Sequence, residues 1–105
     1  MAVAGGSTGR ALFDAALAGG AQALGRLPAG LVPGASADIV SLDPASPALA
    51  GRDGDARLDS WFFGGHPCVD CVWVRGVRQV AGGRHKDRLQ VLEGYRAALC
   101  RLKAR

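Results

Sequence analysis

The sequence predicts an α+β fold: a helix, a small three-stranded sheet with antiparallel or mixed pairing, and an amphipathic C-terminal helix. Apolar residues recur at helical spacing near both ends of the chain, and short β-branched runs lie between them. Glycine pairs separate these runs. With 105 residues, of which 49% are hydrophobic and 21% charged, the chain has the size and composition of one globular domain.

The first helix is expected over residues 7–24, where apolar residues repeat every three or four positions. A hydroxyl side chain at its start and Gly25 after its end supply the usual caps. Gly19 and Gly20 would each cost about 1 kcal/mol relative to alanine inside a helix. We therefore expect another element to pack close to the helix backbone at these two glycines.

The first strand is expected over residues 37–42, an apolar run. The turn Pro33-Gly34 leads into it, because proline presets φ and glycine accepts a positive φ. Residues 44–59 are predicted to form a loop, since proline, glycine and aspartate recur in them. A short apolar element follows at residues 59–63.

A β-hairpin is expected next, over residues 69–74 and 77–80. Both runs have strand-like composition, and the connection Arg75-Gly76 favours a tight two-residue turn. Apolar residues at helical spacing then mark the C-terminal amphipathic helix: Leu89, Leu92, Tyr95, Leu99 and Leu102.

These elements divide the chain into a helix in residues 1–26, a partial β-domain in residues 27–83 and a basic helical segment in residues 84–105. The basic segment carries seven Arg or Lys and two acidic side chains, whereas residues 1–83 carry six basic and seven acidic ones. A basic helix can bind phosphate. Only Tyr95 interleaves an aromatic ring with these cations, which disfavours nucleic acid as a partner. We therefore expect the basic side chains of residues 84–105 to form a solvated helix face.

The sequence indicates no membrane association and no secretion. The first residues lack the basic and apolar regions of a signal peptide, and no apolar run is long enough to span a bilayer. Three cysteines, an odd number, fit a reducing compartment better than a disulfide framework. We expect a cytoplasmic protein.

The candidate metal-binding and redox residues have simpler interpretations. Cys68 and Cys71 form a Cys-x-x-Cys pair at the start of a predicted strand, where alternate side chains point to opposite faces, and Cys100 stands alone. A structural zinc site would need a second such pair. The two histidines, His66 and His85, lie in glycine-flanked turns nineteen residues apart.

Three carboxylates could suggest a calcium loop: Asp53, Asp55 and Asp59. The later bidentate glutamate of an EF-hand is missing, so a turn with local side-chain hydrogen bonds is the better interpretation. The sequence therefore predicts no catalytic residue, no cofactor-binding residue and no metal ligand in this chain.

Several segments resemble a known enzyme family. The stretch from Gly30 to Asp43, Gly-Leu-Val-Pro-Gly-Ala-Ser-Ala-Asp-Ile-Val-Ser-Leu-Asp, is similar to a segment shared by many members of the amidohydrolase superfamily of metal-dependent hydrolases. Further segments narrow the resemblance to the formimidoylglutamate deiminases, a family of histidine degradation: Gly9–Leu17, Gly51–Ala56, Leu58–Gly65 and Gly83–His85.

The resemblance implies a parent enzyme in which a (β/α)₈ barrel holds a divalent metal, often zinc, that activates water for attack at a C–N centre. None of the family's metal ligands can be assigned to a position of this chain. The resemblance therefore implies a C-terminal, non-catalytic portion of such an enzyme, comprising the last barrel helix and part of a small β-domain. Residues 1–6 and the Cys68–Cys71 segment depart from the family pattern.

An enzyme portion of this kind should leave apolar surface uncovered. We expect an interaction surface at Phe13, Leu17, Trp61 and Phe62, covered by the missing catalytic barrel or by self-association. Arg10 would lie nearest the rim of the barrel's active site, where it could contact substrate or stand as a surface arginine. The alternative function is an independent interaction module that binds an acidic partner or nucleic acid through the basic C-terminal helix.

Overall fold

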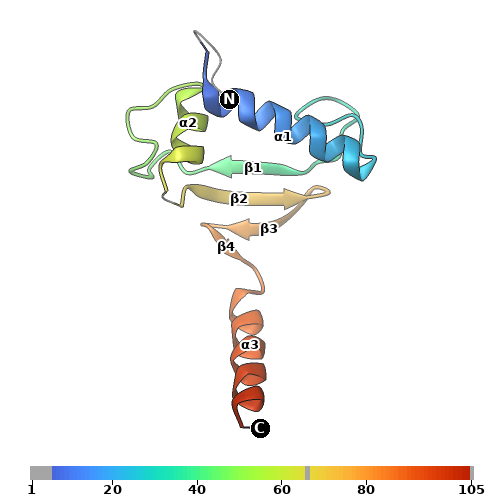
Figure 1. Cartoon of the computed structure of the whole chain (residues 1–105), viewed down its shortest axis with the longest axis vertical. Helices are drawn as coiled ribbons and strands as arrows, with labels where there is room; N and C mark the ends of the chain where they lie inside the picture. The colour runs from blue at the N-terminus through green and yellow to red at the C-terminus, as the bar shows by residue number, and fades with distance from the viewer. Residues whose placement is uncertain (1–5, 66, 105) are drawn as a thin grey trace.

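The computed structural model describes residues 6–65 and 67–104 of the chain. Its elements, in chain order, are α1 (Thr8–Leu24), β1 (Ile39–Leu42), α2 (Ala56–Phe63), β2 (Val69–Val74), β3 (Val77–Ala81), β4 (Arg84–His85) and α3 (Arg88–Lys103). The helices α1 and α2 lie together at the β1 side of the sheet, whereas α3 points away from the β4 side (Figure 1). The molecule is elongated, with extents of 57 × 34 × 25 Å.

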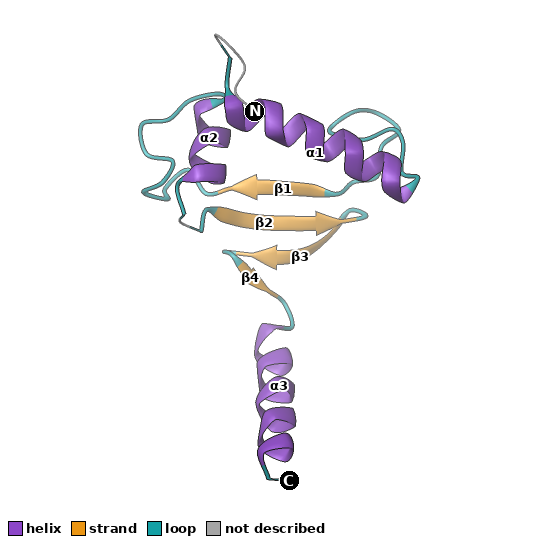
Figure 2. Cartoon of the chain, viewed as in Figure 1, coloured by secondary structure: helices purple, strands orange, loops and turns teal. Residues whose placement is uncertain are grey.

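The strands form one antiparallel sheet in the order β1-β2-β3-β4, so the predicted α+β fold class is confirmed (Figure 2). The sequence prediction contained three strands, and the structure adds the two-residue strand β4. Gly82 and Gly83 make the turn before it, with φ of 59° and 74°. Their N–H groups donate to the side-chain and backbone oxygens of Asp70 at 3.1 and 2.8 Å. Helix α3 therefore begins at Arg88 rather than at the start of the basic segment.

The predicted hairpin is confirmed at Arg75-Gly76, where β2 turns into β3 and Val74 pairs with Val77. Both turn residues have positive φ, 50° for Arg75 and 78° for Gly76, as a two-residue turn between twisted strands requires. The Arg75 N–H donates to Oδ1 of Asp38 at 2.8 Å. This bond ties the turn to the residue that precedes β1.

Helix α1 also agrees with the prediction. The Ser7 hydroxyl accepts a hydrogen bond from the Arg10 N–H at 3.0 Å, and Gly25 ends the helix in the left-handed conformation with φ of 66°. The close neighbour expected at Gly19 and Gly20 is not among the described residues. Apart from the adjoining residues and the nearby backbone of α1 itself, no described atom lies within 4 Å of the position that a Cβ at either glycine would occupy.

Helix α2 was not predicted as a helix, so the prediction of a loop reaching residue 59 was wrong. Turn hydrogen bonds from Ala56 to Asp53 and from Arg57 to Gly54 lead directly into it. At eight residues, α2 is too short for a clear periodic pattern. It packs against α1.

The core is small. The buried residues of the described hydrophobic core are Ala21, Leu49 and Cys68, and Ser46 is a buried polar residue. No large side chain among the described residues is fully buried. The described helices also include none that is both long and apolar enough to cross a bilayer.

Candidate interaction groove

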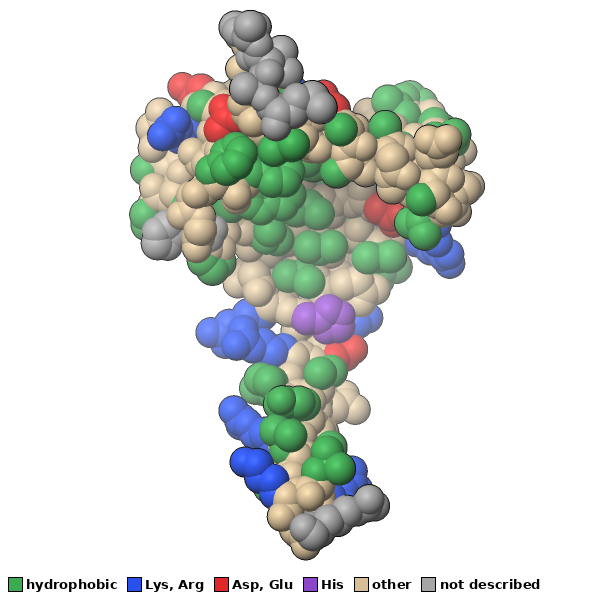
Figure 3. Space-filling model, viewed as in Figure 1, with side chains coloured by type: hydrophobic (Ala, Val, Ile, Leu, Met, Phe, Trp, Pro, Cys, Tyr) green, Lys and Arg blue, Asp and Glu red, His purple; other side chains and the backbone are tan. Residues whose placement is uncertain are grey.

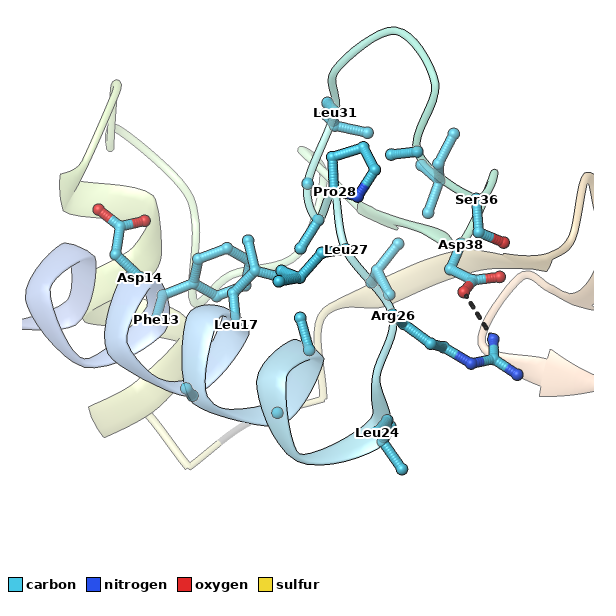
Figure 4. A pocket seen from close by; sticks show the side chains of 18 of the residues that line it. Phe13, Asp14, Leu17, Leu24, Arg26, Leu27, Pro28, Leu31, Ser36 and Asp38 are labelled. Atoms are coloured by element: carbon cyan, nitrogen blue, oxygen red, sulfur yellow. Dashed lines mark ion pairs between the residues drawn. The ribbon is translucent and has the colours of Figure 1, made fainter.

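An open apolar groove runs along the side of α1 that faces β1, with a volume of about 960 Å³. We call it the α1 groove. Figure 3 shows apolar side chains gathered below α1 on this face of the molecule. In Figure 4, Phe13 and Leu17 of α1 lie across from the connection that leads to β1. The principal apolar lining residues are Phe13, Leu17, Leu24, Leu27, Leu31 and Ile39.

The two ends of the α1 groove are charged. Arg10 and Asp14 lie in the first half of α1, and Arg26 and Asp38 form an ion pair of 3.7 Å beyond its end (Figure 4). The pKa of Asp38 is lowered, chiefly because its carboxylate accepts the hydrogen bond from the Arg75 backbone, and the nearby Ser36 hydroxyl and Arg26 guanidinium act in the same direction. The apolar middle therefore has a polar boundary at each end, as protein-binding surfaces often do.

One carboxylate fixes the start of α1 against α2. Oδ1 of Asp59 accepts hydrogen bonds from the Ser7 hydroxyl at 2.8 Å and from the Gly9 N–H at 2.6 Å. A Cβ at Gly9 would lie 2.6 Å from the backbone nitrogen of Asp59, so only glycine permits this approach. The start of α1 is thus hydrogen-bonded to Asp59 of α2, and the two backbones lie close together at Gly9.

Arg10 lies at the same junction. Its guanidinium makes a 3.0 Å ion pair with Asp55 and a 3.3 Å ion pair with Asp14. The hydrogen bond with Asp55 is the largest cause of a raised pKa for Arg10, followed by the one with Asp14. The guanidinium is therefore engaged by two carboxylates of its own chain.

The remaining carboxylate of the predicted turn, Asp53, forms an ion pair with Arg57 at 3.5 Å. The three aspartates thus serve the turn and the α1–α2 junction in this structure. Within residues 6–65 and 67–104, no three His, Cys, Asp or Glu side chains are grouped closely enough to hold a metal ion.

Three of the four residues predicted as an interaction surface form an aromatic cluster between α1 and α2. The ring centroids of Phe13 and Trp61 are 6.1 Å apart, those of Phe13 and Phe62 6.4 Å, and those of Trp61 and Phe62 5.6 Å. Leu17 lies one helical turn farther along and lines the α1 groove with 39% of its surface exposed. Phe62 remains 43% exposed.

The cysteines and the described histidine do not come together. Cys68 is buried, Cys71 is half-buried in β2, and Cys100 is exposed on α3; all three are free. Nδ1 of His85 accepts a hydrogen bond from the Asp87 N–H at 3.0 Å, so this histidine stabilises the turn before α3. His66 lies outside the described residues.

The sequence interpretation missed the connection between α1 and β1 as a wall of the groove. Leu24, Leu27 and Leu31 are 74%, 71% and 80% exposed. These three leucines, at the end of the predicted helix and in the loop after it, could have indicated the wall from the sequence, because clusters of exposed large apolar residues mark interaction surfaces.

Comparison with known proteins shows which enzymes this chain is similar to. No family model matches the chain. A stretch of 78 residues, 73% of this chain, is 51% identical to the formimidoylglutamate deiminase of Pseudomonas aeruginosa strain PAO1 and covers 17% of that protein. The crystal structure of an amidohydrolase from Brucella melitensis matches 96% of this chain and 22% of its own, with a TM-score of 0.85 and 51% identity. In sequence and in fold, this chain is similar to a part of an amidohydrolase.

The resemblance predicted from the sequence is therefore confirmed. The chain spans only about a fifth of the length of the two amidohydrolases that it matches. The α1 groove is described here for this chain without the rest of such an enzyme.

Proposed function

We propose that this chain is a non-catalytic, structural segment of a formimidoylglutamate deiminase-like amidohydrolase. The observation that carries the proposal is the α1 groove, an open apolar surface in a chain that matches only about a fifth of its relatives. Large apolar surfaces of this kind are normally covered by a partner. In our proposal, the catalytic part of the amidohydrolase covers it, and the cytoplasm is the compartment.

The described residues do not fit the family's divalent metal. A catalytic zinc site uses three protein ligands and an open position, and the described residues offer no group of three candidate ligands. We therefore assign the metal, for which zinc is the expected ion, and the hydrolysis of the C–N bond to the rest of the amidohydrolase. No chemical step is assigned to this chain.

Arg10 has a structural role in this proposal. Its guanidinium is held by Asp55 and Asp14, both on the same chain. A substrate carboxylate would have to displace these two partners. We propose that Arg10 orients the start of α1 and does not contact substrate.

A chimera tests the proposal. The region of the Pseudomonas deiminase that aligns with this chain is replaced by the corresponding residues of this chain, and turnover of N-formimidoyl-L-glutamate is measured. We expect turnover by the chimera and none by the isolated chain. Turnover by the isolated chain that a chelator abolishes would contradict the non-catalytic role. A folded, metal-loaded chimera without activity would contradict the assignment to this enzyme.

The alternative is an interaction module that binds an acidic partner or nucleic acid through α3. The observation in its favour is the projection of α3 from the body with four Arg or Lys and one Glu along its length. Binding of a fluorescent DNA duplex that weakens steeply with rising salt would support this function. Absence of binding at low salt would exclude nucleic acid as the partner.

A further inference from the structure

The far end of the α1 groove, beyond the end of α1, holds an arginine in an unusual backbone conformation. Arg75 lines the groove from the turn between β2 and β3, with φ of 50°. Among residues 6–65 and 67–104, it is the one non-glycine residue with a positive φ. This conformation is unfavourable for most side chains, and two-residue hairpin turns prefer glycine, asparagine or aspartate in it. The hairpin by itself therefore gives no reason for an arginine at position 75.

The backbone contacts of the turn do not require the arginine side chain either. The Arg75 N–H donates to Oδ1 of Asp38 at 2.8 Å, and the Gly76 N–H donates to the backbone oxygen of Ala37 at 2.9 Å. Both donors are backbone groups, so any residue except proline at position 75 could make the first bond. The two bonds hold the turn against the residues that precede β1. They therefore fix the point at which the Arg75 side chain leaves the backbone.

The guanidinium of Arg75 has no carboxylate partner within the described residues. Asp38 also lines this end of the groove, but its carboxylate forms its ion pair with Arg26, at 3.7 Å. The other ion pairs of the described chain belong to Arg10 and Arg57. Arg75 is exposed, so its cation is open to a group from another segment.

The formal side-chain charges at the two ends of the α1 groove are opposite. At the far end, the Arg26–Asp38 ion pair is neutral and Arg75 adds a positive charge. At the other end, Arg10 is neutralised by one of its two carboxylate partners, and the second leaves a negative charge. Complementary charges at the edge of an interface fix its register. A segment that fits the groove therefore has apolar side chains along its middle and a carboxylate opposite Arg75.

We propose that Arg75 forms an ion pair with a carboxylate of the catalytic part of the amidohydrolase, where that part covers the α1 groove. The inference rests on the proposed function and names the chemistry of the covering segment. The planar guanidinium matches a carboxylate with two parallel hydrogen bonds. Such a pair offsets the unfavourable backbone conformation in the whole enzyme, whereas the chain alone has nothing to offset it.

Carbodiimide cross-linking of the Pseudomonas chimera tests the ion pair directly. Arg75→Lys supplies a primary amine, which the carbodiimide joins as an amide to a carboxylate in ion-pair contact, and peptide mass spectrometry identifies that carboxylate. We expect an Asp or Glu outside the residues of this chain. Arg78→Lys is the matched control, because Arg78 is an exposed arginine of the same hairpin that does not line the groove. It should give no cross-link to the catalytic part.

The cross-links also separate this inference from the proposed function. A cross-link from position 75 to Asp38 alone, no cross-link, or equal yields from positions 75 and 78 would overturn the inference. If such a chimera still turns over substrate, the proposed function stands without the Arg75 pair. A folded, metal-loaded chimera without turnover contradicts the proposed function instead, and its cross-links still decide whether Arg75 meets the catalytic part.

Thermal unfolding of the isolated full chain tests the same inference without the chimera. Arg75→Asn should raise the Tm by about 2–6 °C, because asparagine suits the turn and no ion pair of this chain is lost. Arg75→Ala removes the same guanidinium but keeps an unfavourable residue at positive φ, so the Tm should change by less than about 1 °C. A lower Tm for both variants would show that the arginine already stabilises this chain and would overturn the inference.

Discussion

Helices α1 and α3 have nearly equal lengths, 17 and 16 residues, but very different surroundings. The start of α1 is capped by Ser7, bonded to Asp59 and packed against the aromatic residues of α2. Helix α3 has no side-chain hydrogen bond at its N-cap and no buried residue. Apolar periodicity predicts both helices, whereas the contacts that hold a helix in place come from other segments.

A second contrast lies within α1. Its start is joined to α2, although Phe13 there also lines the α1 groove. Its second half continues along the groove and contains Gly19 and Gly20, where no described atom beyond the adjoining residues and the nearby helix backbone lies within 4 Å of a Cβ position. The start of α1 is thus packed against another helix, whereas the second half of α1 borders an open groove. Substitutions in the two halves should therefore have different effects.

The largest effect should follow Gly9→Ala in the joined half. The new Cβ would lie 2.6 Å from the backbone nitrogen of Asp59, so the junction must open, and we expect a loss of about 2 kcal/mol in the free energy of unfolding. Gly19→Ala is the matched control, with no atom within 4 Å, and should stabilise by up to about 1 kcal/mol. Thermal unfolding measures both. A neutral Gly9→Ala would show that α1 and α2 do not meet in this way.

Asp59→Ala should have the next largest effect. It removes the acceptor for Ser7 and Gly9, and leaving those donors unpaired costs about 1–3 kcal/mol. Asp53→Ala instead removes the ion pair between Asp53 and Arg57. Because the Asp53 side chain is 98% exposed, this variant should change the free energy of unfolding by less than about 0.5 kcal/mol. Urea unfolding of the two variants compares them. Equal losses would contradict a special role for Asp59.

Phe13→Leu should have a smaller effect. The substitution keeps an apolar side chain but removes two aromatic pairs, each worth about 0.5–1.5 kcal/mol. Phe63→Leu changes the same residue type at a position that is 65% exposed and should be nearly neutral. If both variants unfold at the same temperature, the aromatic cluster does not hold α1 against α2.

Asp38→Asn should have the smallest effect, visible only in acid. The pKa of Asp38 is lowered in the folded chain, so the stability that its charge contributes is present above the unfolded pKa of about 3.9 and is lost as the pH falls through the folded value. Asparagine keeps an acceptor for the Arg75 N–H but has no charge to lose. The unfolding free energy of the variant should fall less steeply below about pH 4. If the unfolding free energies of the variant and the unmodified chain fall equally steeply in acid, the Asp38–Arg75 contact is contradicted.

The sequence predicts well what local chemistry determines. The caps of α1, the hairpin at Arg75-Gly76 and the run that becomes β1 follow from residue types at fixed positions. It does not predict α2, which is short and depends on packing against α1. The Gly9–Asp59 contact joins residues 50 positions apart, so no local pattern could reveal it. Of the residues predicted as an interaction surface, Phe13, Leu17 and Trp61 line the α1 groove. Its other wall was not predicted, because that wall is a loop.

The most direct test of the account compares Gly20→Ala in the isolated chain and in the Pseudomonas chimera. Gly20 lines the α1 groove, and no described atom beyond the adjoining residues and the nearby helix backbone lies within 4 Å of its Cβ position, so alanine should raise the Tm of the isolated chain. If the catalytic part covers the groove, the added methyl group at position 20 should clash with it, and the same substitution should lower the Tm of the chimera. Gly19→Ala provides the reference, because Gly19 does not line the groove. A Gly20→Ala chimera stabilised as much as the isolated chain would contradict a covered groove.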